Sequence, residues 1–320
     1  MIAATARRYG PPEVMTLEDL PAPRPGPGQL LIRVAAFGVT RGDARIRGLD
    51  APRGMALPMR LVFGLTRPRR PIPGREFSGS VEGLGPGVSG WRLGEAVMGI
   101  TDGLTLGAGA EFLTVSAKGL IARRPDSLTP PQAAGFVFGA LTAADFLLDQ
   151  AALAPGERLL VNGATGAVGL AALQLARHIG ARTTAICSPP NHAIAQSLGA
   201  AQTADYRRPL PQGPWDVILD IAGTLPWAAA QPLLAQGGRL CLVTADLAGL
   251  LGASLHPRRG SQRLCARVVR ETPQALARAL ALQAQGALSP QITALPMAQI
   301  TEAHRIAGSG HKTGSVVVTL

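Results

Sequence analysis

The stretch "LVNGATGAVGLAALQLARHIGARTTAIC", Leu160–Cys187, decides the fold of this chain. It begins as an apolar strand, passes through a glycine-rich turn, continues as an amphipathic helix and ends as a second apolar strand. Apolar residues recur every three or four positions from Val168 to Ile179, and Gly180 follows as a helix stop. A strand–helix–strand unit of this kind places its two strands parallel, with the helix lying across them. The sequence therefore predicts a parallel sheet covered by helices.

The turn in this unit spaces its small residues as Ala164-x-Gly166-x-x-Gly169, with Ala in the first position of the G-x-G-x-x-G pattern. Gly166 would let the backbone approach a pyrophosphate, and Gly169 would let the helix pack close to the strand. The helix N-terminus would direct free N–H groups at the phosphates. A tight turn without a ligand is the alternative, but strand, turn, helix and next strand all agree with a dinucleotide site. The expected cofactor contacts here are Asn162, Ala164, Thr165, Gly166, Ala167, Val168 and Gly169.

The end of the second strand bears on which dinucleotide binds. An NAD site carries Asp or Glu about 20 residues after the loop, for the ribose 2′-hydroxyl. Here Cys187 and Ser188 stand in that place, and no carboxylate follows before Asn191. A carboxylate would repel a 2′-phosphate, whereas Ser188 and Asn191 can donate hydrogen bonds to it; Ser188 can also cap a helix. We therefore predict NADPH, with Arg207 and Arg208 as the nearest downstream cations for the adenosine end.

The patterns of the chain divide it into two domains. Residues 1–122 consist of short strand-like segments and turns, with few helical windows, which indicates a β-rich, barrel-like domain. From residue 123 strands and helices alternate, beginning with a helical pattern over 127–153, which indicates a doubly wound parallel sheet. Residues 247–264 are compatible with either a loop or a helix, and the chain ends in a helix and a strand. We predict an α/β fold with domains 1–122, completed by 287–320, and 123–286.

The charge of the chain is strongly positive, +11, and it resides almost entirely on arginine, because Lys118 and Lys312 are the only lysines. The densest basic stretch contains Arg67, Arg69 and Arg70 among prolines and has no aromatic platform, so we expect no nucleic-acid partner. No apolar run approaches the roughly 18 residues of a membrane span, and the N-terminus has no apolar signal segment. We expect a cytoplasmic protein without a membrane partner.

The cysteines do not point to a metal or a disulfide framework. Cys187, Cys241 and Cys265 form no C-x-x-C pair, and none has a histidine at ligand spacing. We interpret them as buried or partly buried thiols in a reducing compartment.

The whole chain resembles the medium-chain dehydrogenase/reductase superfamily, and within it the zinc-independent quinone oxidoreductase branch. The resemblance implies a GroES-like β-rich domain followed by a Rossmann domain. Six blocks carry it in the family's order: "YGPPEVMTLEDLPAPRPGPGQLLIRVAAFGV", "PGREFSGSVEGLGPGVSGWRLGEAVMG", "ALTAADFLL", "LLVNGATGAVGLAALQLARHIGA", "SLGAAQTADY" and "AHRIAGSGHKTGSVVV".

The resemblance also implies roles for particular residues, and departures from them. Zinc members place a Cys where this chain has Thr40 and a His where it has Arg75, so no metal site is expected. The branch carries an Asn at the position of Thr40 and often a Tyr at that of Arg45. Thr142 resembles the threonine near the nicotinamide. Tyr206 resembles the tyrosine that meets the adenosine phosphate, and Lys312 resembles the basic residue that reaches the cofactor.

We therefore expect Thr40, Arg45 and Thr142 to line the reaction site in the cleft between the domains. A solvated surface position is the alternative for Arg45 and for Lys312. The predicted activity is hydride transfer from NADPH to a small molecule, a quinone or an activated enone, both of which suit a site without a strong general acid. The alternatives are a biosynthetic enoyl or carbonyl reductase, and an NADPH-binding protein with little turnover. The resemblance implies a homodimer, with "GRLCLV" and "RLCARVV" as candidate edge strands.

Overall fold

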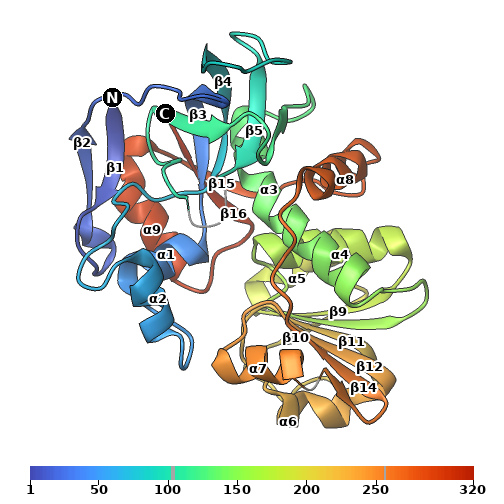
Figure 1. Ribbon diagram of the computed structural model, residues 1–320. Helices are drawn as coiled ribbons and strands as arrows, with labels where there is room; N and C mark the ends of the chain where they lie inside the picture. Colours follow the sequence, from blue (N-terminus) through green and yellow to red (C-terminus); the bar gives the residue numbers. More distant parts are fainter. Residues whose placement is uncertain (102–104, 256) are drawn as a thin grey trace.

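The computed structural model describes residues 1–101, 105–255 and 257–320 and contains two large sheets (Figure 1). The first sheet has the strand order β15-β16-β3-β4-β5-β7, with β6 paired to the other end of β3. A separate antiparallel hairpin, β1-β2, lies beside it. The strands are β1 (Ile2–Ala6), β2 (Met15–Asp19), β3 (Gln29–Val39), β4 (Glu76–Leu84), β5 (Ala96–Ile100), β6 (Phe112–Ser116), β7 (Ile121–Arg123), β15 (Ile292–Pro296) and β16 (Ser315–Thr319).

The second sheet has the order β10-β9-β8-β11-β12-β14-β13, and all its neighbours are parallel except β13 and β14. Its strands are β8 (Arg158–Asn162), β9 (Arg182–Cys187), β10 (Gln202–Asp205), β11 (Trp215–Asp220), β12 (Leu234–Leu242), β13 (Arg258–Arg259) and β14 (Gln262–Cys265). Its helices are α4 (Ala167–Ile179), α5 (His192–Ser197), α6 (Trp227–Ala230), α7 (Leu247–Leu255) and α8 (Pro273–Ala284). The chain turns back at β8, so the switch point lies between β8 and β11. The predicted Rossmann sheet and the two-part α/β fold are confirmed.

The return of the chain to the first sheet explains how the ends of the sequence come together. β16 pairs antiparallel with β3, and β15 lies parallel to β16 at the edge. Buried residues alternate along β3, where Leu30, Ile32 and Val34 point into the core. The C-terminal segment thus belongs to the β-rich domain, as the sequence suggests, while the precise domain limits stay a prediction.

Helix α3 (Pro130–Ala144) joins the two sheets and continues as a π-helical turn, Asp145–Gln150. Thr129 caps its start by a reciprocal pair of hydrogen bonds with Gln132. The 21 residues Pro130–Gln150 are long and apolar enough to cross a membrane, which the sequence analysis overlooked, but 78% of the most apolar window is buried inside the protein. This burial identifies α3 as a core helix.

Three parts of the sequence analysis need correction. The β-rich region also contains α1 (Arg41–Gly48) and α2 (Ala56–Phe63), and α9 (Ile300–Gly308) packs against α1. The segment 247–264, which the sequence left open between a loop and a helix, contains α7. The stretch "GRLCLV" lies in β12, between β11 and β14, so it is not an edge strand. The stretch "RLCARVV" begins within β14. This strand is not an edge strand either, because β13 pairs with its outer side, with Arg258 opposite Arg263 and Arg259 opposite Gln262.

Candidate functional site

The glycine-rich loop has the geometry that an anion site requires. Gly166 is the N-cap of α4, no side chain caps this helix, and a Cβ on Gly166 would meet nothing within 4 Å. A Cβ on Gly169 would lie 2.4 Å from the carbonyl carbon of Ala164, so only glycine fits there. Gly163 has φ +84°, a left-handed conformation that glycine adopts without strain. The first amides of α4 are thus exposed to an open approach, as pyrophosphate binding needs.

Asn162, predicted to contact the cofactor, ties two strand ends together in this structure. Its Nδ2 donates to Oδ1 of Asp220 at 2.8 Å and to Oγ1 of Thr224 at 2.8 Å. Asp220 is buried at the end of β11, where it also accepts hydrogen bonds from the backbone N–H groups of Gly223 and Leu225. Burial raises the pKa of the Asp220 carboxyl. The carboxyl ends of β8 and β11 are therefore fixed to each other at the switch point.

At the expected adenosine end, the structure brings in a carboxylate that the sequence analysis missed. Asp205 on β10 pairs in register with Cys187 on β9. Burial, followed by the charge of Asp205, raises the pKa of the Cys187 thiol to about 11. The Asp205 carboxylate forms an ion pair with Arg207 at 2.8 Å. Tyr206 is half exposed, and its ring centroid lies 5.9 Å from the Arg207 guanidinium carbon. Asp205 and Cys187 come together through the register of the parallel strands β9 and β10, which the spacing of residues along the sequence does not show.

The segment between α9 and β16 crosses to the glycine-rich loop. The Thr313 hydroxyl donates to Oδ1 of Asn191 at 3.2 Å, and the Asn191 amide donates to Oγ1 of Thr165 at 3.2 Å. The backbone N–H of Gly314 donates to the Thr165 carbonyl at 2.8 Å. Lys312 donates to the Gly314 carbonyl at 2.8 Å. Asn191 is thus engaged at both ends of its amide, and we call the Thr313–Asn191–Thr165 chain the latch.

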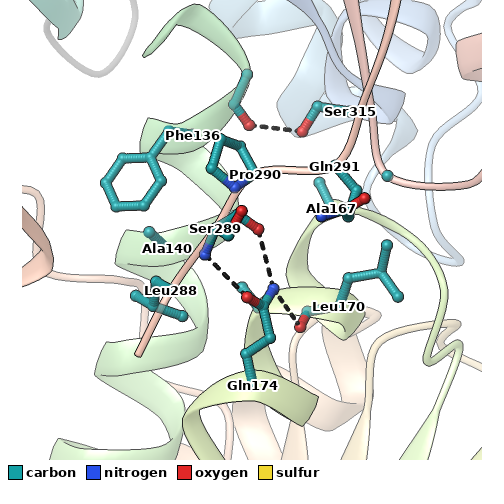
Figure 2. Close-up of a pocket in the computed structure, with 14 residues that line it drawn as sticks. Phe136, Ala140, Ala167, Leu170, Gln174, Leu288, Ser289, Pro290, Gln291 and Ser315 are labelled. Atoms are coloured by element: carbon teal, nitrogen blue, oxygen red, sulfur yellow. Dashed lines mark hydrogen bonds between the residues drawn. The ribbon is translucent and has the colours of Figure 1, made fainter. Parts of the chain in front are cut away.

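A second connection holds the domains together on the other side of α4 (Figure 2). Gln174 accepts from the backbone N–H of Ser289 at 2.8 Å and donates to the Ser289 carbonyl at 3.0 Å. The Ser315 hydroxyl donates to the Gly135 carbonyl at 2.6 Å. The cavity between these groups is about 20 Å³. It has room for about one water molecule, so it anchors the crossover segment and is not a substrate site.

A larger cleft of about 580 Å³ opens between the two domains at the carboxyl ends of β11 and β12. Its lining from the Rossmann domain includes Asp220, Gly223 and Thr244, and its opposite wall includes Arg41 and Arg45 of α1. Open α/β sheets bind ligands in such a crevice. Figure 1 shows α1 on the side of the β-rich domain that faces the Rossmann sheet.

Of the three residues predicted for the reaction site, Arg45 lines this cleft. Burial and the neighbouring charge of Arg41 lower the pKa of the Arg45 guanidinium, and within the described part of the chain neither arginine forms an ion pair. Thr142 is 2% exposed inside α3 and does not line the cleft. The predicted set is therefore only partly brought together.

Thr40 serves as the N-cap of α1. Its hydroxyl donates to Oδ2 of Asp43 at 2.6 Å and accepts from the Asp43 backbone N–H at 3.2 Å. Oδ1 of Asp43 accepts from the backbone N–H of Gly74 at 3.1 Å. The Thr40 proton is committed to a buried carboxylate, so donating it to a substrate would break the cap.

Buried titratable groups lie behind α1, and of these the sequence analysis identified only Lys312 as a site residue. Glu76 is 3% exposed and accepts a hydrogen bond from the backbone N–H of Phe138 at 2.7 Å. Burial raises the pKa of Glu76 to about 8 and lowers that of Lys312 to about 8, and each opposes the shift of the other. His304 of α9 is fully buried, and burial lowers its pKa to about 4. The available signal was an acid at the start of a strand of small and apolar residues, "EFSGSV".

The position that resembles a zinc ligand carries a fixed positive charge. Arg75 forms an ion pair with Glu271 at 2.6 Å, which links the loop before β4 to the start of α8. Residues 1–101, 105–255 and 257–320 contain no group of three His, Cys, Asp or Glu side chains placed to hold a metal ion. The three cysteines are free thiols, Cys187 and Cys241 buried and Cys265 partly buried.

Two family models and a number of known proteins match the sequence of this chain. Residues 26–126 match a family model described as "Alcohol dehydrogenase GroES-like domain", and residues 198–318 match one described as "Zinc-binding dehydrogenase". A chloroplastic quinone oxidoreductase of Triphysaria versicolor is 27% identical over 315 residues, covering 94% of this chain and 92% of the relative.

Two solved structures agree with these matches over the full chain. The quinone oxidoreductase of Coxiella burnetii superposes with a TM-score of 0.87 at 26% identity, covering 100% of this chain and 99% of the other. A mycobacterial protein solved in complex with NADPH superposes with a TM-score of 0.81 at 26% identity, covering 100% of both chains.

Proposed function

Because the chain belongs to the quinone-oxidoreductase-like branch of the medium-chain dehydrogenase/reductase superfamily, we propose that it transfers hydride from NADPH to a quinone or an activated enone. One observation carries this proposal. The uncapped, open N-terminus of α4 and the cleft of about 580 Å³ occupy the same carboxyl edge of the sheet. A dinucleotide bound with its phosphates at Gly166 has the cleft beside it for an acceptor.

Three features support NADPH over NADH. Ser188 offers a hydroxyl at the end of β9, and residues 187–191 contain no carboxylate. The nearest carboxylate, Asp205, is neutralised by Arg207, and Arg208 follows with no ion pair within the described residues. A structure similar to this chain was solved with NADPH. Arg207 and Arg208 beside β10 would supply positive charge to a 2′-phosphate.

Bound NADPH would supply the hydride, so the part of the protein is to position the acceptor and to exclude water. The cleft walls hold the acceptor, and Asn162 keeps the β8 and β11 ends at a fixed separation. Thr40 does not act as the acid, because its proton is held by Asp43. A quinone suits this site, since its reduced anion takes its protons from water, whereas an enone requires one proton at its α-carbon.

We propose that the reaction requires no zinc. Thr40 and Arg75 stand where zinc members carry a Cys and a His, and a guanidinium paired with Glu271 cannot ligate a metal. Dialysis against a chelator should leave the rate unchanged. A loss of activity that added zinc restores would overturn this part of the proposal.

The decisive experiment follows NADPH oxidation by the purified protein with 9,10-phenanthrenequinone and, separately, with an alkenal. Turnover of either acceptor supports the proposal, and turnover of the alkenal alone would restrict it to activated enones. Tight NADPH binding without oxidation of either would favour a binding protein. Equal KM values for NADH and NADPH would overturn the cofactor preference.

We also propose a cytoplasmic homodimer. Within the described residues the edge strands of the Rossmann sheet are β10 and β13, so a partner's sheet would extend this sheet at one of these two strands. Light scattering on the purified protein tests this, and a monomer at micromolar concentration would overturn it.

A further inference from the structure

Helix α2 and the loop that follows it stand away from the core. None of the residues of α2 is buried, although its sequence is ALPMRLVF. Leu57 is 64% exposed, Leu61 54% and Leu65 53%. Figure 1 shows the helix and the loop projecting from the body below α1. Leucines on a free helix face are costly in water, and contiguous exposed apolar groups mark a contact surface.

The segment is nevertheless well attached. The Tyr9 hydroxyl donates to the Gly64 carbonyl at 2.7 Å, and the Arg69 backbone N–H donates to the Phe63 carbonyl at 2.8 Å. The α2 helix and its loop thus form one fixed unit, and its apolar side chains are displayed by the fold.

The charge of this unit has a single sign. Residues 51–75 contain six arginines and no Asp or Glu. Arg75 is paired with Glu271, whereas the other five form no ion pair in the described part of the chain, and Arg60 donates only to the Leu65 carbonyl. Elsewhere many arginines are paired with carboxylates, as Arg33 is with Glu82 and Arg278 is with Asp149. The five free arginines are Arg53, Arg60, Arg67, Arg69 and Arg70.

This unit borders the mouth of the interdomain cleft. Pro52 and Arg53 line the cleft, and the Arg53 carbonyl accepts a hydrogen bond from the backbone N–H of Leu247. Leu247 begins α7, a second helix without a buried residue, which exposes Leu251 and Leu255. Helix α7 therefore lines the cleft, and the segment that leads into α2 is bonded to its first residue.

We propose that α2, its arginine-rich loop and α7 form a surface that docks on an anionic lipid bilayer, with the cleft mouth beside the membrane. An interfacial site combines exposed apolar groups with unpaired cations, because the former enter the acyl boundary while the latter meet anionic headgroups. The expectation of no membrane partner was argued from the lack of a membrane-spanning run in the sequence. The proposed surface would lie on a bilayer without crossing it, so this proposal revises that expectation.

The charge and composition of this surface distinguish between three possible partners: a second copy of the chain, a nucleic acid and an anionic bilayer. A second copy of the chain docking through the same face would bring two sets of five unpaired arginines together, which repel. A single-stranded nucleic acid needs exposed aromatic rings for stacking, and Phe63, the one aromatic residue in 51–75, is only partly exposed. An anionic bilayer matches both the sign of the charge and the leucines.

The test is co-sedimentation of the full-length protein with vesicles of phosphatidylcholine containing 30% phosphatidylglycerol, and with vesicles of phosphatidylcholine alone. The variants are L57D/L61D for the apolar face and R67E/R69E for the charge. The matched controls are L93D, in the loop between β4 and β5 where Leu93 is 66% exposed, and R24E, where Arg24 is exposed and unpaired within the described residues. Thermal unfolding of every variant checks that it folds.

We expect the wild-type protein and both controls to bind the anionic vesicles, with binding that weakens as salt rises, and each patch variant to bind at least about tenfold less. Absence of wild-type binding, or equal binding by L57D/L61D, would overturn the proposal. A change from dimer to monomer in L57D/L61D together with no vesicle binding by wild type would assign the surface to self-association. The measurement needs no turnover, so its failure leaves the proposed hydride transfer standing.

Discussion

Two regions of the proposed site, the glycine-rich loop and the α1 wall of the cleft, differ in how their residues are constrained. In the glycine-rich loop, backbone sterics fix the residue type, because a Cβ on Gly169 would lie 2.4 Å from the Ala164 carbonyl carbon. On the α1 wall, Arg41 and Arg45 line a cleft of about 580 Å³ without ion-pair partners in the described residues. A residue type that backbone sterics require can be recognised in a sequence, whereas the role of an unpaired side chain depends on the residues that the fold places across from it.

The largest effect is expected from Gly169→Ala. The added methyl group has no space against Ala164, so we expect a loss of about 2–3 kcal/mol in the free energy of unfolding. The displaced start of α4 should also weaken NADPH binding by about 100-fold. Denaturant unfolding and a fluorescence titration with NADPH measure the two effects.

Gly166→Ala is the matched control within the same loop. Gly166 has φ −75° and open space around a Cβ, so the fold should lose no more than about 1 kcal/mol while NADPH affinity still falls. If this variant bound NADPH as tightly as wild type, the pyrophosphate would not approach at Gly166.

The buried carboxyl behind α1 gives the next effect. The pKa of Glu76 in the folded protein is about 8 against a usual 4.5, so ionisation opposes folding and wild-type stability falls as pH rises from about 4.5 to about 8. Glu76→Gln removes this titration and keeps an oxygen for the Phe138 N–H. The stability of the variant relative to wild type should therefore increase between pH 5 and pH 8, by up to a few kcal/mol at about 1.4 kcal/mol for each unit of pKa shift.

Thermal unfolding across pH measures this difference. Glu82→Gln is the control, because the hydrogen bond from Arg33 lowers the pKa of that exposed carboxyl and gives at most a small slope of opposite sign. A constant difference between Glu76→Gln and wild type over this pH range would show that Glu76 is ionised throughout.

Arg45→Leu tests the cleft wall itself. An unpaired guanidinium at the cleft should attract an anionic acceptor, so the KM of a quinone bearing a sulfonate should rise about tenfold while that of a neutral quinone stays unchanged. Steady-state kinetics with both acceptors measure this, and Arg24→Leu is the surface control. Equal changes for both quinones would indicate a loss of cleft shape instead of charge.

The smallest effect is expected at the latch. Thr313→Val removes the hydroxyl that donates to Asn191 and keeps the side-chain shape, so the free energy of unfolding should fall by about 1 kcal/mol, which denaturant unfolding measures. An unchanged free energy of unfolding would show that this hydrogen bond does not help to hold the segment before β16 against the glycine-rich loop.

Several features were predictable because they are local. The helix within 127–153, the stop at Gly180 and the Rossmann strands follow from short-range patterns, and the structure confirms them. The structure brings only some of the predicted reaction-site residues to the cleft. Arg45 reaches the cleft, but Thr40 is a helix cap and Thr142 is enclosed in α3, because their surroundings come from other parts of the chain. The cofactor role of Tyr206 stays a prediction.

The arrangement of a strand, a glycine-rich turn and a helix that present backbone amides to an anion is encoded locally, because glycine spacing and helix periodicity act within a few residues. Three other properties appear only in the folded chain: Asp205 lies beside Cys187, Glu76 is buried, and α2 remains uncovered. These properties depend on strand register, burial and the packing of distant segments. A single stretch of sequence contains none of these, since each arises between residues far apart in the chain.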